Sequence, residues 1–348
     1  MDVLVCATQV PFRPAGPASA TEDLVGDLVG ALGAAGHRAE AVVVPAASDR
    51  ERLLDAALAW RLVPLDADLV IAVDFPAYFA RHRRKIAWLA DNHRRDDHEG
   101  LALEPGPDPE LDRTWSEDLR QVVDWDIRAL AEARYRYAVS DLVAARVRRQ
   151  CGLSTATLPA PPPLADRLRP RSGAPGSFVL HVARPGVDER SGLFLAGLAA
   201  SVRPVPGVVA CLGRSPGSIP ADVERLGLGH RVHVPRAVRP QTLVDLYANA
   251  IAVVHTPVDA HQAQVTLQAF RAGVPVITPV DSGPVVEWVE HGVTGLVTDG
   301  TARGLGAAID RLAADPDLAA RLGAAARARV ADLAWDRVVG ALTRDLVR

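Results

Sequence analysis

Short apolar segments alternate with helical segments along the whole sequence, and this alternation limits the fold more than any other feature. The run 3–7 is apolar and rich in β-branched residues, and in 21–35 leucines and valines recur at helical spacing. Strands that alternate with helices in this way lie parallel, because each helix carries the chain back to the start of the next strand. The sequence therefore predicts an α/β protein whose parallel sheets are covered by helices on both faces.

A proline-rich stretch divides this pattern into two halves. Before it, residues 69–73 are expected to form a strand, 118–137 a helix and 138–140 a further strand. Six prolines then fall within 159–175, and the alternation begins again beyond them. A chain of 348 residues is long enough for two domains with separate cores. The expected parts are an N-terminal Rossmann-like domain, 1–165, a C-terminal Rossmann-like domain, 166–330, and a last segment, 331–348.

Charge and composition count against several classes of protein. The 39 basic and 42 acidic side chains give a net charge of -3, whereas proteins that bind nucleic acid usually carry a concentrated basic excess. No apolar run reaches the roughly 18 residues of a membrane-spanning helix, and the first residues lack the pattern of a signal peptide. We therefore expect a cytoplasmic protein without a transmembrane segment. Cys6, Cys151 and Cys211 lie far apart, which favours neither a disulfide framework nor a zinc site.

Two common nucleotide-binding motifs are missing. Ligands of open parallel sheets bind at the carboxyl ends of the strands, but no GxGxxG follows the first strand and no GxxxxGK[ST] occurs anywhere. This counts against a dehydrogenase and against a P-loop enzyme. Lys85 is the only lysine, so arginine must supply the cations of any phosphate site.

The segment from His255 to Val297, HTPVDAHQAQVTLQAFRAGVPVITPVDSGPVVEWVEHGVTGLV, resembles the nucleotide-binding core of family 4 glycosyltransferases. Further similar segments are 31–37, 75–94, 136–147, 181–192 and 313–335. The resemblance implies the GT-B architecture, in which two Rossmann-like domains face a cleft and a last helix, within 331–348, crosses back to the N-terminal domain. It also implies transfer from a nucleoside diphosphate sugar with retention at the anomeric carbon, without a cofactor or a catalytic metal.

Two arginines are the candidate catalytic residues that the resemblance implies. Family members use an arginine after the first strand of the C-terminal domain and a lysine a few residues later. Here Arg184 stands at the first position, and Arg190, one residue late, is the candidate for the second. Their guanidinium groups suit phosphate oxygens, and we expect them to stabilise the departing diphosphate. For Arg190, a solvated surface position near Asp188 and Glu189 is the alternative.

Both glutamates of the family motif are replaced. In the family, one glutamate contacts the donor sugar and the other, eight positions later, accepts hydrogen bonds from both ribose hydroxyls. Ala260 and Gln268 stand at these positions. Gln268 keeps one carbonyl oxygen and stays a candidate for the ribose. Asp259 and His261 flank Ala260 and are candidates to reach the donor, with a solvated loop as the alternative.

The paired glycines of the family are replaced as well. After the strand that ends near Pro279 the sequence reads DSGP, and its proline removes one backbone donor. Small residues also stand at the family's glycine pair before the first helix. The candidate donor-binding residues of these loops are Ser282, Gly283, Glu287, Ser19 and Ala20, with a purely structural role as the alternative for Glu287.

The acceptor side offers a polar segment after 75–90. Asp91, His93 and Arg94 are its candidates, because a carboxylate or an imidazole can remove a proton from an acceptor hydroxyl. A hydrated surface loop is the alternative. The triplet 66–68, DAD, resembles the metal-binding motif of another glycosyltransferase class, but it immediately precedes a strand and is interpreted as a turn, so no metal site is assigned.

Two functions from different classes follow. The resemblance implies a glycosyltransferase that moves a sugar from a nucleoside diphosphate donor to a small-molecule or glycan acceptor. The alternative is a catalytically silent relative, a partner or regulatory subunit, because the glutamates, the lysine and both glycine pairs are missing. A third interpretation, an unusual donor or a non-glycosidic product, stays open. So does association with a second copy or a partner transferase through apolar surface at Trp60 or Trp115.

Overall fold

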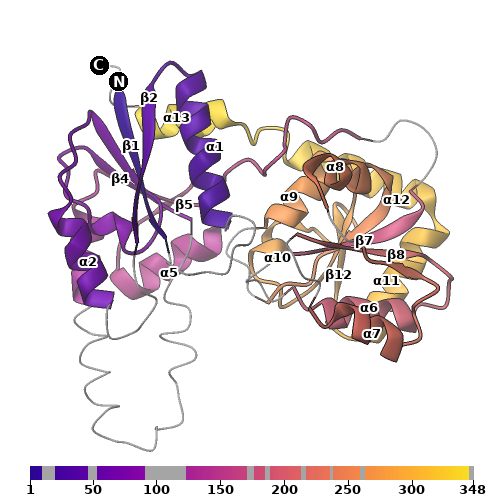
Figure 1. Ribbon diagram of the computed structural model, residues 1–348. Coiled ribbons are helices and arrows are strands. Elements are labelled where there is room, and N and C mark those ends of the chain that lie inside the picture. Colours follow the sequence, from indigo (N-terminus) through magenta and orange to yellow (C-terminus); the bar gives the residue numbers. More distant parts are fainter. Residues whose placement is uncertain are drawn as a thin grey trace, which may run out of the picture. The chain divides into compact units, whose positions relative to one another are not determined.

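The computed structural model (Figure 1) describes residues 1–9, 20–45, 53–90, 123–170, 176–184, 189–212, 217–235, 238–258 and 263–344. These residues form two compact units. The chain passes from the first unit to the second between Ala160 and Pro161, and it returns to the first at Trp335.

The first unit is built on a six-stranded parallel sheet with the order β2-β1-β3-β4-β5-β6. Its strands are β1 (Asp2–Gln9), β2 (Arg38–Pro45), β3 (Leu69–Ala72), β4 (Lys85–Leu89), β5 (Tyr135–Ala138) and β6 (Ala156–Thr157). Its helices are α1 (Ala20–Ala34), α2 (Leu53–Leu62), the short η2 (Ala77–Phe79), 123–131, α5 (Asp141–Cys151) and α13 (Trp335–Thr343). Every residue of β3 and β4 is buried, as expected for central strands covered on both faces.

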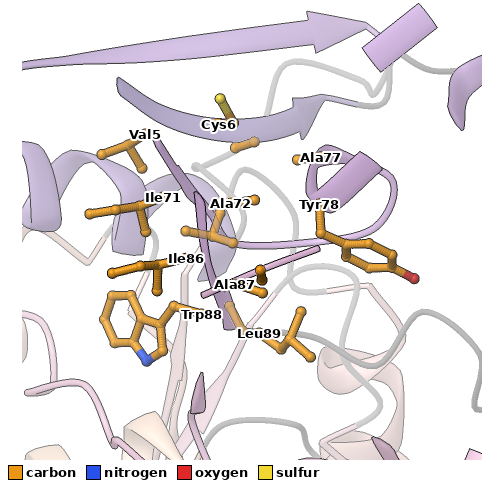
Figure 2. Packing of buried hydrophobic residues seen from close by; sticks show 14 of the residues in the cluster. Val5, Cys6, Ile71, Ala72, Ala77, Tyr78, Ile86, Ala87, Trp88 and Leu89 are labelled. Atoms are coloured by element: carbon orange, nitrogen blue, oxygen red, sulfur yellow. The ribbon is translucent and has the colours of Figure 1, made fainter. Parts of the chain in front are cut away.

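The register of these strands builds rows of apolar side chains across the sheet (Figure 2). Val5 on β1 lies opposite Ile71 on β3, and Ile71 lies opposite Ile86 on β4. Each following residue points to the other face, so the residues after these three make a second row there. Both faces of the central strands therefore contribute to one core.

Lys85 lies in this core and not at a phosphate site. Its side chain is fully buried at the start of β4, and Nζ donates hydrogen bonds to the carbonyl oxygens of Tyr78 and Ala129, each at 2.9 Å. Nζ also lies 3.2 Å from Oε2 of Glu132. Burial lowers the pKa of Lys85, and the nearby carboxylate of Glu132 offsets part of this shift. The lysine therefore joins β4 to η2 and to the helix 123–131.

The second unit also has a six-stranded parallel sheet, with the order β12-β11-β10-β7-β8-β9. Its strands are β7 (Phe178–Ala183), β8 (Gly207–Cys211), β9 (Val232–His233), β10 (Ala250–Val254), β11 (Val276–Pro279) and β12 (Gly295–Thr298). Its helices are α6 (Ser191–Ala200), α7 (Ile219–Arg225), α8 (Pro240–Asn249), α9 (Gln264–Arg271), α10 (Pro284–Trp288), α11 (Ala302–Ala314) and α12 (Pro316–Arg329).

Helices cover both faces of this second sheet. Figure 1 shows α6, α7 and α11 along one face and α8 and α9 along the other. Val179 of β7 packs in the core under α6 and α11, and the next residue, Leu180, packs in the core under α8 and α9. The continuous apolar runs that marked the strands in the sequence are therefore explained by burial on both faces.

Two expectations from the sequence are wrong in detail. Residues 135–137, expected as the end of a helix, belong to strand β5, which pairs with β4 along its whole length. Trp60 offers no surface for a partner, because it is fully buried and its Nε1 donates to Oγ1 of Thr8 at 3.2 Å. Trp115 lies outside the described residues. Throughout the described ranges, every helix is too short or too polar to cross a bilayer.

Candidate functional site

The strand order of the second unit marks where a ligand is expected. The chain builds β7, β8 and β9 in one direction and then returns to place β10 on the other side of β7. Open parallel sheets bind ligands at the carboxyl ends of the strands that flank such a reversal. The residues that leave these ends are Arg184 after β7 and His255 after β10, and β11 contributes a neighbouring loop that contains Asp281.

Two internal partners hold the guanidinium group of Arg184. Its Nε donates to Oε1 of Glu189 at 3.0 Å, and its Nη1 donates to Oε1 of Gln264 at 3.0 Å. The side chain is 13% exposed. Within the described part of the chain, Nη2 makes no hydrogen bond, so both of its N–H groups are available to an anion. The orientation of Arg184 is therefore fixed before a ligand arrives.

Glu189 is a buried anion behind Arg184. Its carboxylate is only 3% exposed, and Oε2 lies 3.3 Å from Nε2 of His255. Burial disfavours the charge, but the adjoining His255 and the positive charge of Arg184 outweigh burial and lower the pKa of Glu189 to about 2. Burial also lowers the pKa of His255, whose Nδ1 lies 2.8 Å from Oγ1 of Thr266. The carboxylate is therefore ionised at neutral pH.

A second buried histidine shapes the start of α6. Nδ1 of His181 lies 2.9 Å from the carbonyl oxygen of Val254, and Nε2 lies 3.0 Å from Oγ of Ser191. A carbonyl can only accept, so Nδ1 carries the proton and Nε2 accepts from the serine hydroxyl. The ring stacks on Phe194 with 4.9 Å between centroids. These contacts tie the end of β10 to the first turn of α6.

Arg190 is not the solvated residue that was the alternative from the sequence. It immediately precedes α6 in a left-handed conformation, with φ of 45°, and its side chain is 19% exposed. Nε donates to the carbonyl oxygen of Thr256 at 2.7 Å, and Nη2 donates to that of Pro257 at 3.1 Å. Nη1 and Nη2 also donate to the two carboxylate oxygens of Asp281, both at 2.7 Å. Arg190 therefore connects the ends of β10 and β11.

Part of the chain is similar to known glycosyltransferases. Residues 215–329 match the family model "Glycosyl transferases group 1". The human alpha-1,3/1,6-mannosyltransferase ALG2 is 32% identical over 108 residues, which cover 31% of this chain and 26% of that protein. The match therefore spans about a quarter of that relative.

Solved structures match over nearly the whole chain. Sucrose-phosphate synthase from Thermosynechococcus elongatus has a TM-score of 0.76 at 19% identity and covers 99% of both chains. Anabaena Alr3699/HepE, solved in complex with UDP and glucose, has a TM-score of 0.69 at 17% identity over 100% of this chain and 99% of that one. The chain therefore has a GT-B-like α/β fold, which confirms the fold class predicted from the sequence.

Within the matched residues 215–329, both polar groups of the Gln268 side chain already have hydrogen-bond partners. It is 6% exposed, its Oε1 accepts from the Tyr247 hydroxyl at 2.9 Å, and its Nε2 donates to the carbonyl oxygen of Pro163 at 3.1 Å. A ribose would have to share or replace these partners, and this role stays a prediction. Gln264, one turn earlier on α9, contacts Arg184 and was missed. Its spacing of four residues from Gln268, on the same side of the helix, was the available signal.

The loop between β11 and α10 is closely packed. Ser282 is fully buried, and its Oγ accepts from Nη2 of Arg190 at 3.3 Å. Gly283 has a φ of 60°, a conformation that favours glycine, and Pro284 opens α10. Glu287 is exposed on α10, and its backbone oxygen accepts from Arg329 at 2.9 Å. The structure thus brings Ser282 to Arg190.

Several predicted site residues are not placed. Ser19, Asp91, His93, Arg94, Asp259, Ala260 and His261 lie outside the described residues, and Ala20 is described only as the first residue of α1. In the first unit, the strand order reverses between β1 and β3, and Asp74, which follows β3, was missed. Its carboxylate accepts from the backbone N–H of Thr8, with N to Oδ2 at 2.9 Å.

A separate cavity of about 580 Å³ lies in the second unit. Its lining includes Gly176 before β7, Ala250 at the start of β10 and Pro275 before β11, so it is at the amino ends of these strands. The rest of the lining is mostly alanine, with Arg327 as a charged member. This cavity is at the opposite edge of the sheet from Arg184, and it does not belong to the arginine site.

Proposed function

We propose that the protein is a glycosyltransferase that moves a sugar from a nucleoside diphosphate donor to a small-molecule or glycan acceptor, with retention at the anomeric carbon. The observation that carries the proposal is Arg184, which Glu189 and Gln264 hold at the strand reversal of the second sheet. The match of residues 215–329 to group 1 glycosyl transferases and the Anabaena structure with UDP and glucose support the same donor class.

The proposed reaction requires the protein to stabilise the negative charge on a departing diphosphate. Arg184 is the proposed ligand of that group, because Nη2 is directed by two bonds made at the other nitrogens. An acceptor hydroxyl attacks as the glycosidic bond to phosphate breaks, and its proton passes to the departing phosphate. Asp91, His93 and Arg94 remain the proposed acceptor-side residues. No cofactor or metal is part of the proposed mechanism.

Binding of UDP, GDP and ADP, measured by calorimetry and by the thermal midpoint, tests the proposal. A ligand at about 100 times its dissociation constant adds roughly 2.7 kcal/mol to stability. Arg184→Gln should weaken binding roughly 10- to 100-fold, since bonds to charged groups contribute about 1.5–3 kcal/mol. Arg225→Ala, at an arginine that is 65% exposed on α7, is the matched control and should bind normally. Failure of all three nucleotides to bind would refute the proposal.

A silent relative is the second candidate function, and one observation favours it. Each arginine of the site already pairs with a carboxylate, Arg184 with Glu189 and Arg190 with Asp281, so their charges are balanced without a ligand. A silent relative would show neither transfer nor donor hydrolysis. The double variant Ala260→Glu with Gln268→Glu distinguishes the two functions. A gain of donor hydrolysis would favour a silent relative that lost its activity but kept the fold. Loss of an existing activity would favour an active enzyme with a specialised donor site.

A further inference from the structure

The donor site, as proposed above, has no carboxylate at the two positions where the family carries glutamate. Ala260 and Gln268 carry no charge. Among the described residues, Glu189 and Asp281 are the carboxylates that pair with the two site arginines. Glu189 is buried between Arg184 and His255, so it has no access to a sugar. The side chain of Asp281 is 59% exposed, and it is the one that a ligand can reach.

Arg190 brings Asp281 to the end of a strand other than its own. Asp281 follows β11. The guanidinium group of Arg190, which pairs with Asp281, also donates to the carbonyl oxygens of Thr256 and Pro257, which follow β10. Pro257 precedes Ala260 by three residues in the sequence. The carboxylate is therefore held beside the start of the chain segment in which the family carries its sugar-binding glutamate.

The pairing leaves the carboxylate able to bind a hydroxyl group. Each carboxylate oxygen has two lone pairs, and Arg190 uses one on each oxygen of Asp281, at 2.7 Å. The remaining acceptor positions lie on the outer sides of the two oxygens and point away from each other, and the backbone N–H of Asp281 also bonds the carboxylate. At least one position is therefore left for a sugar hydroxyl. The arginine also fixes the orientation of the group, so little side-chain freedom is lost when a ligand binds.

We propose that Asp281 accepts a hydrogen bond from a hydroxyl group of the donor sugar, in place of the missing glutamate, and that Arg190 is its positioning residue. This inference rests on the proposed function and assigns the sugar end of the donor to the loop after β11. It leaves Arg184 as the principal ligand of the diphosphate.

The test compares two ligands on the same variant by calorimetry. Asp281→Asn keeps the volume of the side chain and one acceptor for Arg190, and it removes the charge. We expect the affinity for the bare nucleoside diphosphate to change less than 2-fold and the affinity for the nucleotide sugar to fall roughly 10- to 100-fold. Asp281→Glu should recover part of the loss. Asp222→Asn, at an aspartate that pairs with Arg225 on α7, is the matched control and should change neither affinity.

Deoxy-sugar donors locate the contact. Removing the contacted hydroxyl should weaken binding to the wild-type protein but have little further effect on Asp281→Asn. A loss that is equal for the diphosphate and the nucleotide sugar would overturn the inference, because Asp281 would then act only through Arg190. Tighter diphosphate binding by Asp281→Asn would also overturn it and would make Asp281 a competitor of phosphate.

The proposed function and the role of Asp281 can be refuted separately. If the wild-type protein binds no nucleotide and no nucleotide sugar, the proposed function fails and this inference with it. If the wild-type protein binds both and Asp281→Asn does so equally well, only the role of Asp281 is refuted. Thermal midpoints of the ligand-free variants, compared with that of Asp222→Asn, show whether any change comes from unfolding.

Discussion

Replacing Glu189 with glutamine should remove stability from the second unit in a pH-dependent way. The carboxylate is 3% exposed, accepts from Nε of Arg184 at 3.0 Å and lies 3.3 Å from Nε2 of His255. Glutamine has nearly the same volume and can still accept from Arg184. Glu189→Gln therefore changes the charge and little else.

The size of the effect follows from the pKa of Glu189, which falls from 4.5 to about 2 in the folded protein. Such a change corresponds to about 3 kcal/mol of stability at neutral pH. Because the folded pKa is the lower one, the contribution is complete above pH 4.5 and is lost as the pH falls toward 2. Between pH 7 and pH 3.5, the stability difference between the wild type and Glu189→Gln should shrink by roughly 1 kcal/mol.

Native-state hydrogen exchange of β7 and β10, corrected for the intrinsic rate at each pH, measures this difference in the second unit alone. Glu290→Gln, at a carboxylate that is 60% exposed and 4.0 Å from Arg329, is the control and should change little at either pH. A difference between the wild type and Glu189→Gln that is the same at pH 7 and pH 3.5 would show that the charge of Glu189 does not stabilise the fold.

Further predictions concern packing, and chemical denaturation checks each of them. Lys85→Ala should destabilise the first unit by roughly 3 kcal/mol, because it leaves a cavity and two buried carbonyl oxygens without their donor; a loss no larger than that of the exposed Arg81→Ala would contradict this. Gly323→Ala should destabilise strongly, because its Cβ would lie 2.0 Å from the backbone oxygen of Gly273. Gly340 lies in α13, and a Cβ added there would have no atom within 4 Å, so Gly340→Ala should stabilise by up to about 1 kcal/mol because alanine favours a helix more than glycine does. Similar effects of the two glycine substitutions would refute the steric reasoning.

The architecture was readable from the sequence because it depends on local patterns. Apolar runs such as 178–183 and the helical spacing between them predict buried parallel strands, and the structure has them. The error at 135–137 has a related cause, since a strand of four residues, YRYA, carries no alternation strong enough to separate it from the preceding helix. Its pairing with β4 and β6 identifies it.

Part of the candidate site could be predicted from the sequence. Arg184 and Arg190 could be placed by their distance from a strand end, which is a local property. Their partners could not, because Gln264 is 80 residues from Arg184 and Asp281 is 91 residues from Arg190. Glu189 is close in sequence, but its burial depends on His255, which reaches it from another strand. Pairings of this kind follow from the order of strands in the sheet.

The buried Lys85 gives the protein an internal reporter. Its ε-amino group is the chain's one lysine amine and is fully buried, so an amine-directed reagent cannot reach it while the first unit stays folded. Acylation of that single nitrogen, followed by mass spectrometry over time, would therefore record how often β4 and its cover open, without an introduced label and without signal from the second unit.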